Sequence, residues 1–336
     1  MRVVAFLLAC SAPATLPDLV TAEQLADKGD IEGAVRAYHE AQIHCRKLQP
    51  ARRAKQACAD ALLGEGEALE HGGRKDAAIA IYLAIPARTV DDPTTAATAT
   101  YRAGQLLLEA GKAVEAWTAL WRVVTEWPDE PLAGDAVKAL LEDGRKRDAR
   151  ALAEQLGKLI TPLAETQVAD NLLWALADLT EHELANAQAA RALYDRIPKD
   201  HPDSGLRDDA RWHAARISRA LGDPKGAAER LRALLATREV AFMAGSYFSV
   251  WLDDAQLELG KVLRDDLHDL PGAIAAFRKL PKDYPASILK DDALYELAVT
   301  FDKAGQHDDA CRSIAALKKQ APESKYLAPA AELHCP

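Results

Sequence analysis

The sequence predicts an all-α fold, built from about eight helical hairpins that stack side by side. Three observations carry this prediction. Alanine dominates the apolar residues while aromatic residues make up only 6% of the chain, which favours closely packed helices over a sheet rich in aromatic and β-branched residues. One spacing of small and apolar residues recurs along nearly the whole chain. Prolines stand where helices have to end.

The recurring spacing is a small residue, a glycine seven positions later, an alanine five positions after that, and a larger apolar residue four positions further on. Glycine takes a left-handed turn without a Cβ penalty, so we place it between two helices. The small residues around it let the two helices approach closely, and the larger residue fills the groove beyond. The six copies are Ala22, Gly29, Ala34, Tyr38; Gly66, Gly73, Ala78, Tyr82; Gly104, Gly111, Ala116, Leu120; Val137, Gly144, Ala149, Ala153; Ala215, Gly222, Ala227, Leu231; and Ala298, Gly305, Ala310, Ile314.

Two further hairpins lack the glycine and have lengthened turns, but keep the alanine and its larger partner, as Ala190 with Tyr194 and Ala273 with Phe277. Proline closes the second helix in several copies because a helix interior does not accommodate it. Counting by the alanine gives eight hairpins. The eight alanines are Ala34, Ala78, Ala116, Ala149, Ala190, Ala227, Ala273 and Ala310, and the closing prolines are Pro128, Pro202, Pro285 and Pro322.

The start of the chain has the pattern of an export signal. Arg2 precedes the apolar run 3–9, which is too short to span a bilayer, and Cys10 follows. Leu7-Leu8-Ala9-Cys10 resembles the lipobox of bacterial lipoproteins, in which the cysteine is lipidated and becomes the first residue. We therefore expect a lipoprotein-type signal peptide over 1–9 and one solenoid domain over 10–336, with a buried N-terminal segment as the alternative.

The four other cysteines fall into two local pairs. Cys45 and Cys58 flank a helix break at Pro50, and Cys311 and Cys335 flank the break at Pro322. Two antiparallel helices that turn at such a break bring the paired cysteines together, so we expect a disulfide in each pair. Loops of this length predict a stabilisation of about 3 kcal/mol for each bridge. Disulfides imply an oxidising compartment, which is the bacterial periplasm if Cys10 is lipidated.

A zinc site is the alternative use of the C-terminal pair. His307 lies four residues before Cys311 on a predicted helix, and His334 adjoins Cys335. Imidazole nitrogen and thiolate sulfur are ligands that zinc prefers, so these four side chains offer a complete ligand set. Free thiols are a third possibility. We favour the disulfide, and we expect no metal and no other cofactor.

No motif indicates catalysis or nucleic-acid binding. Gly64 and Gly66 lack the third glycine of a dinucleotide loop, and Ser246 and Ser249 stand in no nucleophile elbow. A net charge of −9 leaves no basic field for nucleic acid. Paired acids recur at predicted helix starts, where they complement the helix dipole, so we interpret them as capping residues. These pairs are Asp208-Asp209, Asp253-Asp254, Asp291-Asp292 and Asp308-Asp309.

Two groups of aromatic residues are candidates for partner binding. Residues 237–251 are the least repeat-like part of the chain and carry Tyr247, Phe248 and Trp251, of which the first and last share a helix face. Trp117 and Trp121 share a face by the same spacing of four. Exposed aromatic faces receive extended peptides or partner helices. Packing in the core is the competing interpretation.

The repeated hairpins, the lipobox-like start and the echo of 202–210 in 285–293 together resemble bacterial tetratricopeptide outer-membrane lipoproteins and periplasmic scaffolds. This family includes the assembly lipoprotein of the outer-membrane barrel machinery and the coordinator of the Tol-Pal system. The resemblance implies a tetratricopeptide-like α-solenoid with no catalytic activity. Its concave surface would bind envelope proteins or peptides, with no small-molecule substrate.

The resemblance also implies a location. A lipid anchor at Cys10 would hold the chain to the periplasmic face of the outer membrane, or otherwise leave it in the periplasm. The alternative is a soluble adaptor, or an accessory subunit of an enzyme complex, with a structural zinc near Cys311 and Cys335.

Overall fold

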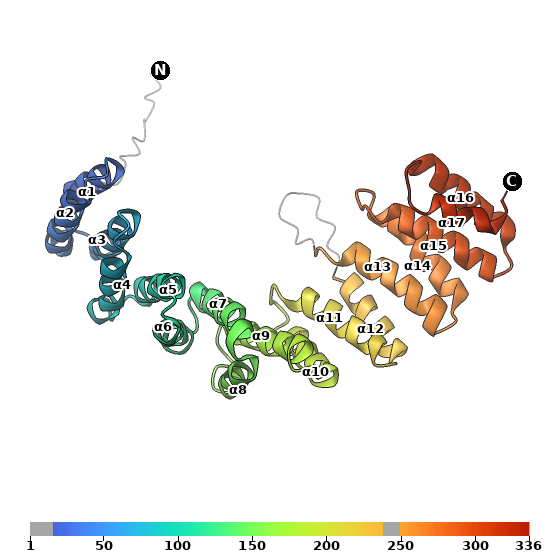
Figure 1. The fold of residues 1–336 in the computed structure, drawn as a ribbon, viewed down its shortest axis with the longest axis horizontal. Coiled ribbons are helices and arrows are strands. Elements are labelled where there is room, and N and C mark those ends of the chain that lie inside the picture. Colours follow the sequence, from blue (N-terminus) through green and yellow to red (C-terminus); the bar gives the residue numbers. More distant parts are fainter. Residues whose placement is uncertain (1–15, 238–248, 336) are drawn as a thin grey trace, which may run out of the picture. The chain divides into compact units, whose positions relative to one another are not determined.

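The computed structural model describes residues 16–237 and 249–335. Over these residues the chain is helical and has no strand, which confirms the predicted all-α class (Figure 1). Successive long helices form eight hairpins, the number predicted from the repeated alanine, and one short helix follows the last of them. Among the described residues no helix is both long enough and apolar enough to cross a membrane.

The chain divides into two compact units. The first comprises residues 1–143 and 165–168, and the second comprises 144–164 and 169–336. A single domain over 10–336 stays a prediction. In the first unit the helices are α1 (Pro17–Asp27), α2 (Ile31–His44), α3 (Ala51–His71), α4 (Lys75–Ala84), α5 (Pro93–Glu109), α6 (Ala113–Glu126) and most of α7 (Pro131–Arg147), with short 3-10 turns η1 (Cys45–Lys47) and η2 (Pro86–Arg88).

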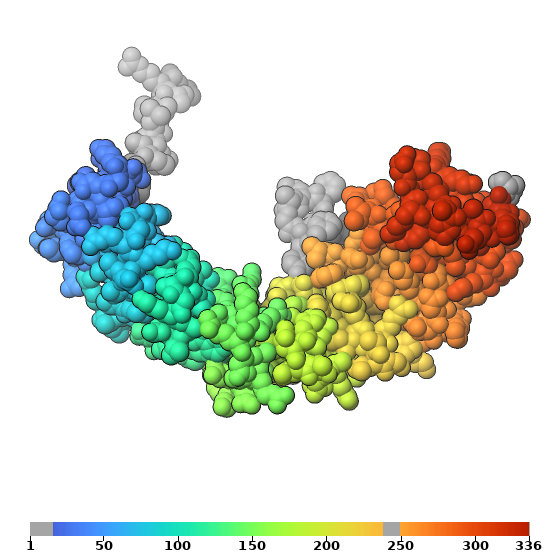
Figure 2. All heavy atoms as spheres, in the orientation of Figure 1, coloured from blue at the N-terminus to red at the C-terminus, as the bar shows by residue number. Residues whose placement is uncertain are grey.

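The described residues of the second unit form the end of α7 and ten further helices. They are α8 (Ala149–Ile160), α9 (Ala169–His182), α10 (Ala187–Asp200), α11 (Arg207–Ala220), α12 (Pro224–Leu235), α13 (Leu252–Lys261), α14 (Leu270–Asp283), α15 (Lys290–Lys303), α16 (His307–Gln320) and α17 (Leu327–Ala330). A π-helical turn, η3 (Val262–Asp266), follows α13, and a 3-10 turn, η4 (Ala331–Leu333), follows α17. Figure 2 shows the side chains that cover these helices.

The glycine turns are confirmed in five of the six predicted copies. Gly29, Gly73, Gly111, Gly222 and Gly305 have positive φ angles between 71° and 77°, in the left-handed region. The residue after each glycine is the N-cap of the second helix. The two hairpins without the glycine use the same conformation, because Ala185 (φ 51°) and His268 (φ 55°) stand directly before the N-caps Asn186 and Asp269.

The fourth predicted copy is wrong in register. Gly144 lies inside α7, and Asp148 alone connects α7 to α8. Because the connection is so short, the fully buried residues of α8 are Leu152 and Leu156. Each lies three residues after the alanine predicted for that place, Ala149 or Ala153. Gly144 instead makes room for the side chain of Leu152, because a Cβ on Gly144 would lie 2.4 Å from Leu152 Cδ2.

The repeated alanines fill the tightest places between helices. The other seven predicted alanines are all fully buried, with 0% exposure. The larger apolar partner packs against a small residue on the preceding helix: a Cβ on Gly66 would lie 2.4 Å from the ring of Tyr82, and a Cβ on Gly260 would lie 2.4 Å from the ring of Phe277. Neither contact leaves room for a side chain at the glycine.

The paired acids stand in the first turns of their helices, where they complement the helix dipole, but none of them is the N-cap residue. In the second unit the first acid of three pairs accepts a hydroxyl hydrogen bond from the start of the next hairpin or from the end of its own, and Asp170, which belongs to no acid pair, does the same. Asp253 accepts from Ser287 over 2.6 Å, and Asp291 accepts from Ser324 over 2.7 Å. Asp170 accepts from Ser204 over 2.6 Å, and Asp208 accepts from Thr237 over 3.1 Å. The echo around Pro202 and Pro285 is therefore a joint between repeats.

Candidate interaction surface

The predicted aromatic residues that the structure describes are partly buried. Trp117 and Trp121 both lie on α6, and the indole Nε1 of Trp117 donates to Asp143 Oδ2 on α7 over 2.7 Å. Trp251 is the N-cap residue of α13 and stacks on Trp212 with ring centroids 5.2 Å apart. Its Nε1 donates to Asp209 Oδ1 over 2.8 Å. The indoles of Trp117 and Trp251 therefore hold neighbouring helices together.

Three predicted site residues fall outside the part of the chain that the structure describes. They are Cys10, Tyr247 and Phe248. The lipid anchor at Cys10 and the aromatic face of Tyr247 with Trp251 stay predictions.

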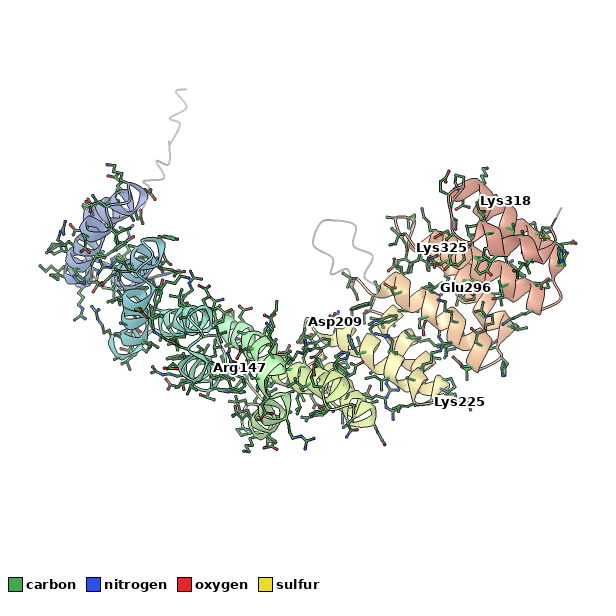
Figure 3. All side chains as sticks on the ribbon, in the orientation of Figure 1. Arg147, Asp209, Lys225, Glu296, Lys318 and Lys325 are labelled. Carbon is green, nitrogen blue, oxygen red and sulfur yellow. A yellow bond between two sulfur atoms is a disulfide. The ribbon has the colours of Figure 1, made fainter. Side chains whose placement is uncertain are left out.

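A row of carboxylates crosses the first helices of three consecutive hairpins in the second unit. Each member stands three or seven residues after the N-cap of α11, α13 or α15, so the repeat places them at equivalent positions. We call this set the acidic row, and two of its members are labelled in Figure 3. The acidic row consists of Asp209, Asp254, Glu258, Asp292 and Glu296.

Most members of the acidic row have a partner of opposite charge or a hydrogen-bond donor. Arg219 Nη1 lies 2.7 Å from Glu258 Oε1, and Lys325 Nζ lies 3.7 Å from Asp292 Oδ1. Glu296 pairs with Arg264, whose side chain is only 8% exposed. These contacts fix the carboxylates in place and neutralise part of their charge.

Asp254 is the exception. No side-chain hydrogen bond or ion pair reaches its carboxylate among the described residues. Burial raises the pKa of Asp254, and the negative charges of Asp253, Asp292 and Glu258 raise it further, while the positive charge of Lys261 offsets part of this effect. The acidic row therefore has at its centre a carboxylate whose negative charge Lys261 offsets only in part, and a cationic group would be stabilised there.

A buried arginine organises the end of the acidic row. The guanidinium of Arg264, in turn η3, contacts Glu296 on α15 and also donates to both carboxylate oxygens of Asp265, over 2.8 and 2.9 Å. Hydrogen bonding by Arg264 lowers the pKa of Asp265 to about 2. Asp265 thus stays ionised and holds Arg264 against Glu296.

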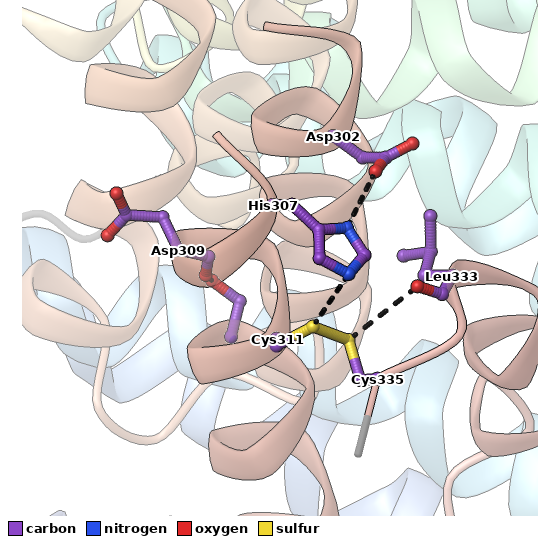
Figure 4. The surroundings of a disulfide bond; sticks show 7 residues. Asp302, His307, Asp309, Cys311, Leu333 and Cys335 are labelled. Atoms are coloured by element: carbon purple, nitrogen blue, oxygen red, sulfur yellow. Dashed lines mark hydrogen bonds and ion pairs between the residues drawn. A yellow bond between two sulfur atoms is a disulfide. The ribbon is translucent and has the colours of Figure 1, made fainter. Parts of the chain in front are cut away.

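The structure pairs the cysteines as two disulfides. Cys45 is bonded to Cys58, with Cα atoms 5.2 Å apart, and Cys311 is bonded to Cys335, with Cα atoms 5.3 Å apart. His307 Nε2 lies 3.6 Å from Cys311 Sγ, while its Nδ1 faces Asp302 (Figure 4). Three of the four side chains proposed for zinc therefore lie together, and His334 is not among them.

Sequence reasoning missed the acidic row. Its signal was present, since an acid four residues after the second member of an acid pair occurs twice, as Asp254 with Glu258 and Asp292 with Glu296. The sequence alone explains the acid pairs as helix caps and gives no reason to group them into one surface. Which helix faces lie next to one another depends on the stacking of hairpins, and local spacing does not specify that.

Stacked helical hairpins with glycine-closed turns define this chain as a helical repeat protein. Residues 46–93 match one tetratricopeptide repeat model, and residues 254–287 and 292–324 match a second model of the same description. Segments in both units are therefore similar to tetratricopeptide repeats. Such repeats generally serve as non-catalytic scaffolds that bind peptides and proteins. No curated protein matches the sequence.

Solved structures with similar folds have low sequence identity. The apo form of RapI is 12% identical, with a TM-score of 0.47, and the alignment covers 89% of this chain and 86% of that one. YrrB, described as a TPR protein with an unusual peptide-binding site, is 12% identical with a TM-score of 0.40, covering 75% and 97%. The C-terminal part of a TPR repeat-containing protein from Cytophaga hutchinsonii is 10% identical with a TM-score of 0.44, covering 93% and 98%. None of these similarities bears on what this chain binds.

Proposed function

We propose that this chain is a non-enzymatic scaffold of the bacterial cell envelope that holds a partner protein on the surface formed by α11, α13 and α15. The observation that carries the proposal is the carboxylate of Asp254, which lies among three other carboxylates and has no ion pair among the described residues. A partner segment with Lys or Arg side chains fits this surface, because an opposite charge relieves the mutual repulsion of the carboxylates.

The partner is found by crosslinking in cells and then purified for affinity measurements. Asp254→Asn should weaken binding about fivefold, the usual size of one partly exposed charge pair. Glu229→Gln is the matched control, because Glu229 is an exposed acid on α12, outside the acidic row. Affinity should also fall as salt is added. Equal affinities for the chain with and without Asp254→Asn would remove the acidic row from the binding surface.

We further propose that the chain is anchored through a lipid on Cys10, at the periplasmic face of the outer membrane. The order Leu7-Leu8-Ala9-Cys10 and the four cysteines placed for disulfides support this location. Mass spectrometry of protein from its native membrane should find an acylated N-terminal Cys10, and Cys10→Ser should release the chain from the membrane fraction. An intact Met1 on the native protein would rule out the anchor.

A further inference from the structure

Two histidines and a carboxylate converge in the second unit, on the surface of α9 and α11. The Nδ1 atom of His213 lies 3.0 Å from Glu181 Oε2, and the Nε2 atom of His182 lies 3.6 Å from the same oxygen. The three ligand atoms all lie within 4.8 Å of one another. Glu181 and His213 are largely buried, with side chains 17% and 16% exposed, whereas His182 is open to solvent on one side.

This spacing suits a first-row divalent metal ion. Zinc binds imidazole nitrogen and carboxylate oxygen at about 2.0 to 2.2 Å, and tetrahedral geometry then places neighbouring ligand atoms roughly 3.3 Å apart. The two distances to Glu181 Oε2 fall on either side of that value. We propose that Glu181, His182 and His213 form a binding site for a zinc-like divalent cation, a role that does not depend on the proposed function.

Neighbouring side chains hold the ligands in position. The Tyr194 hydroxyl donates to Glu181 Oε2 over 3.0 Å. The indole of Trp174 packs edge-on against the rings of Tyr194 and His213, with centroids 5.2 and 5.3 Å away. Such outer contacts fix the orientation of metal ligands.

A second carboxylate lies at the edge of the site. Asp178 Oδ1 is 3.7 Å from His182 Nε2, and the other oxygen of Asp178 pairs with Arg145. Asp178 is thus placed to complete the coordination shell or to orient His182. With both histidines neutral, the two carboxylates and the arginine carry a net charge of −1, which favours a cation.

A simple histidine–carboxylate pair elsewhere in the chain provides a contrast. In the first unit His39 Nε2 lies 2.8 Å from the buried Glu65, and Gln42 Nε2 donates to the other carboxylate oxygen. One histidine and one amide satisfy that carboxylate, and no second metal ligand is present among the described residues nearby. His39 therefore gives a matched control, because it also pairs with a glutamate but has no second histidine beside it.

Calorimetric titration with zinc chloride tests the site on the full chain, freed of metal by a chelator, without a histidine tag or reductant. We expect one saturable site, with affinity at least tenfold weaker in His182→Ala and in Glu181→Gln and unchanged in His39→Ala. His182 is half exposed, so its replacement should leave the circular dichroism spectrum unchanged. Binding that persists in His182→Ala, or no saturable binding to the unaltered chain, overturns the proposal.

Two further measurements separate this site from the C-terminal cysteines. Cobalt bound to the site should give the visible absorption bands of a tetrahedral ion, and these should disappear in His182→Ala. The double variant Cys311→Ser/Cys335→Ser should keep both the bands and the zinc affinity. Loss of zinc binding in the cysteine variant would instead assign the metal to Cys311 and Cys335.

Discussion

Ser287 donates its hydroxyl hydrogen bond to Asp253 Oδ2 over 2.6 Å, across the joint between α13 and α15. The same serine oxygen accepts from the backbone N–H of Leu289, directly before α15 begins. One side chain thus starts a helix and ties it to the previous hairpin. Asp253 is partly buried, so the bond is charge-assisted and shielded from water.

Replacing Ser287 should loosen this joint. Ser287→Ala removes both hydrogen bonds and leaves Asp253 Oδ2 without its hydroxyl donor, although Oδ1 still accepts from the backbone N–H of Asp254. We therefore expect a loss of about 1 to 2 kcal/mol in the free energy of unfolding, measured by urea denaturation. Thr118→Ala is the control, because Thr118 is exposed and bonds only within its own helix. Equal losses in the two variants would show that the joint adds nothing beyond local helix structure.

The left-handed alanine at position 185 should respond to glycine. Ala185 has φ 51°, a conformation that penalises any residue with a Cβ. Ala185→Gly should stabilise the fold by about 1 kcal/mol, and the mirror change Gly222→Ala should destabilise it by a similar amount. Both variants are compared in thermal and urea unfolding. A destabilised Ala185→Gly protein would contradict the conformation of this turn.

The two disulfides should contribute to stability and leave no thiol among their cysteines. Removing either pair by double serine substitution should lower stability by about 3 kcal/mol, given loops of 13 and 24 residues. A thiol titration of the denatured, unreduced chain should find Cys45, Cys58, Cys311 and Cys335 all blocked. The zinc alternative would instead be favoured by two results together. The chain would have two free thiols, and it would bind one zinc ion that is lost in Cys311→Ser.

Two aspartates should give pH effects of opposite sign. The pKa of Asp265 is lowered, so its ionised form stabilises the fold above the ordinary carboxyl pKa, and that stability is lost as the pH falls toward 2. Asp265→Asn should therefore cost about 1 kcal/mol at pH 7, allowing for solvent screening, and almost nothing near pH 2.

The pKa of Asp254 is raised, so ionisation of this residue opposes folding. The stability that its protonated form provides is lost as the pH rises through the folded-state pKa. Asp254→Asn should therefore stabilise the chain at neutral pH, with a gain that disappears in acid. Paired urea denaturation curves at pH 7 and pH 2 measure both variants. A destabilised Asp254→Asn protein at pH 7 would mean that the carboxylate has a partner of opposite charge.

The sequence by itself determined the features that depend on neighbours along the chain. Helix periodicity, the glycine turns at Gly29 or Gly222 and the prolines after the second helices are local preferences, so they predicted the all-α class and the count of eight hairpins. The prediction of a glycine turn failed at Gly144. This glycine occupies the same place in the repeated sequence pattern as the turn glycines, but the structure needs it for close contact with Leu152 and not for a positive φ.

Tertiary structure alone decided which distant side chains meet. His182 and His213 stand on different helices, and a whole hairpin separates Asp253 from Ser287 along the sequence. No local spacing of residues therefore predicts either contact. The pKa of Asp254 likewise depends on Asp292, one repeat later. Stacking brings such residues together because the buried alanines fix how closely and at what register each hairpin lies on the next.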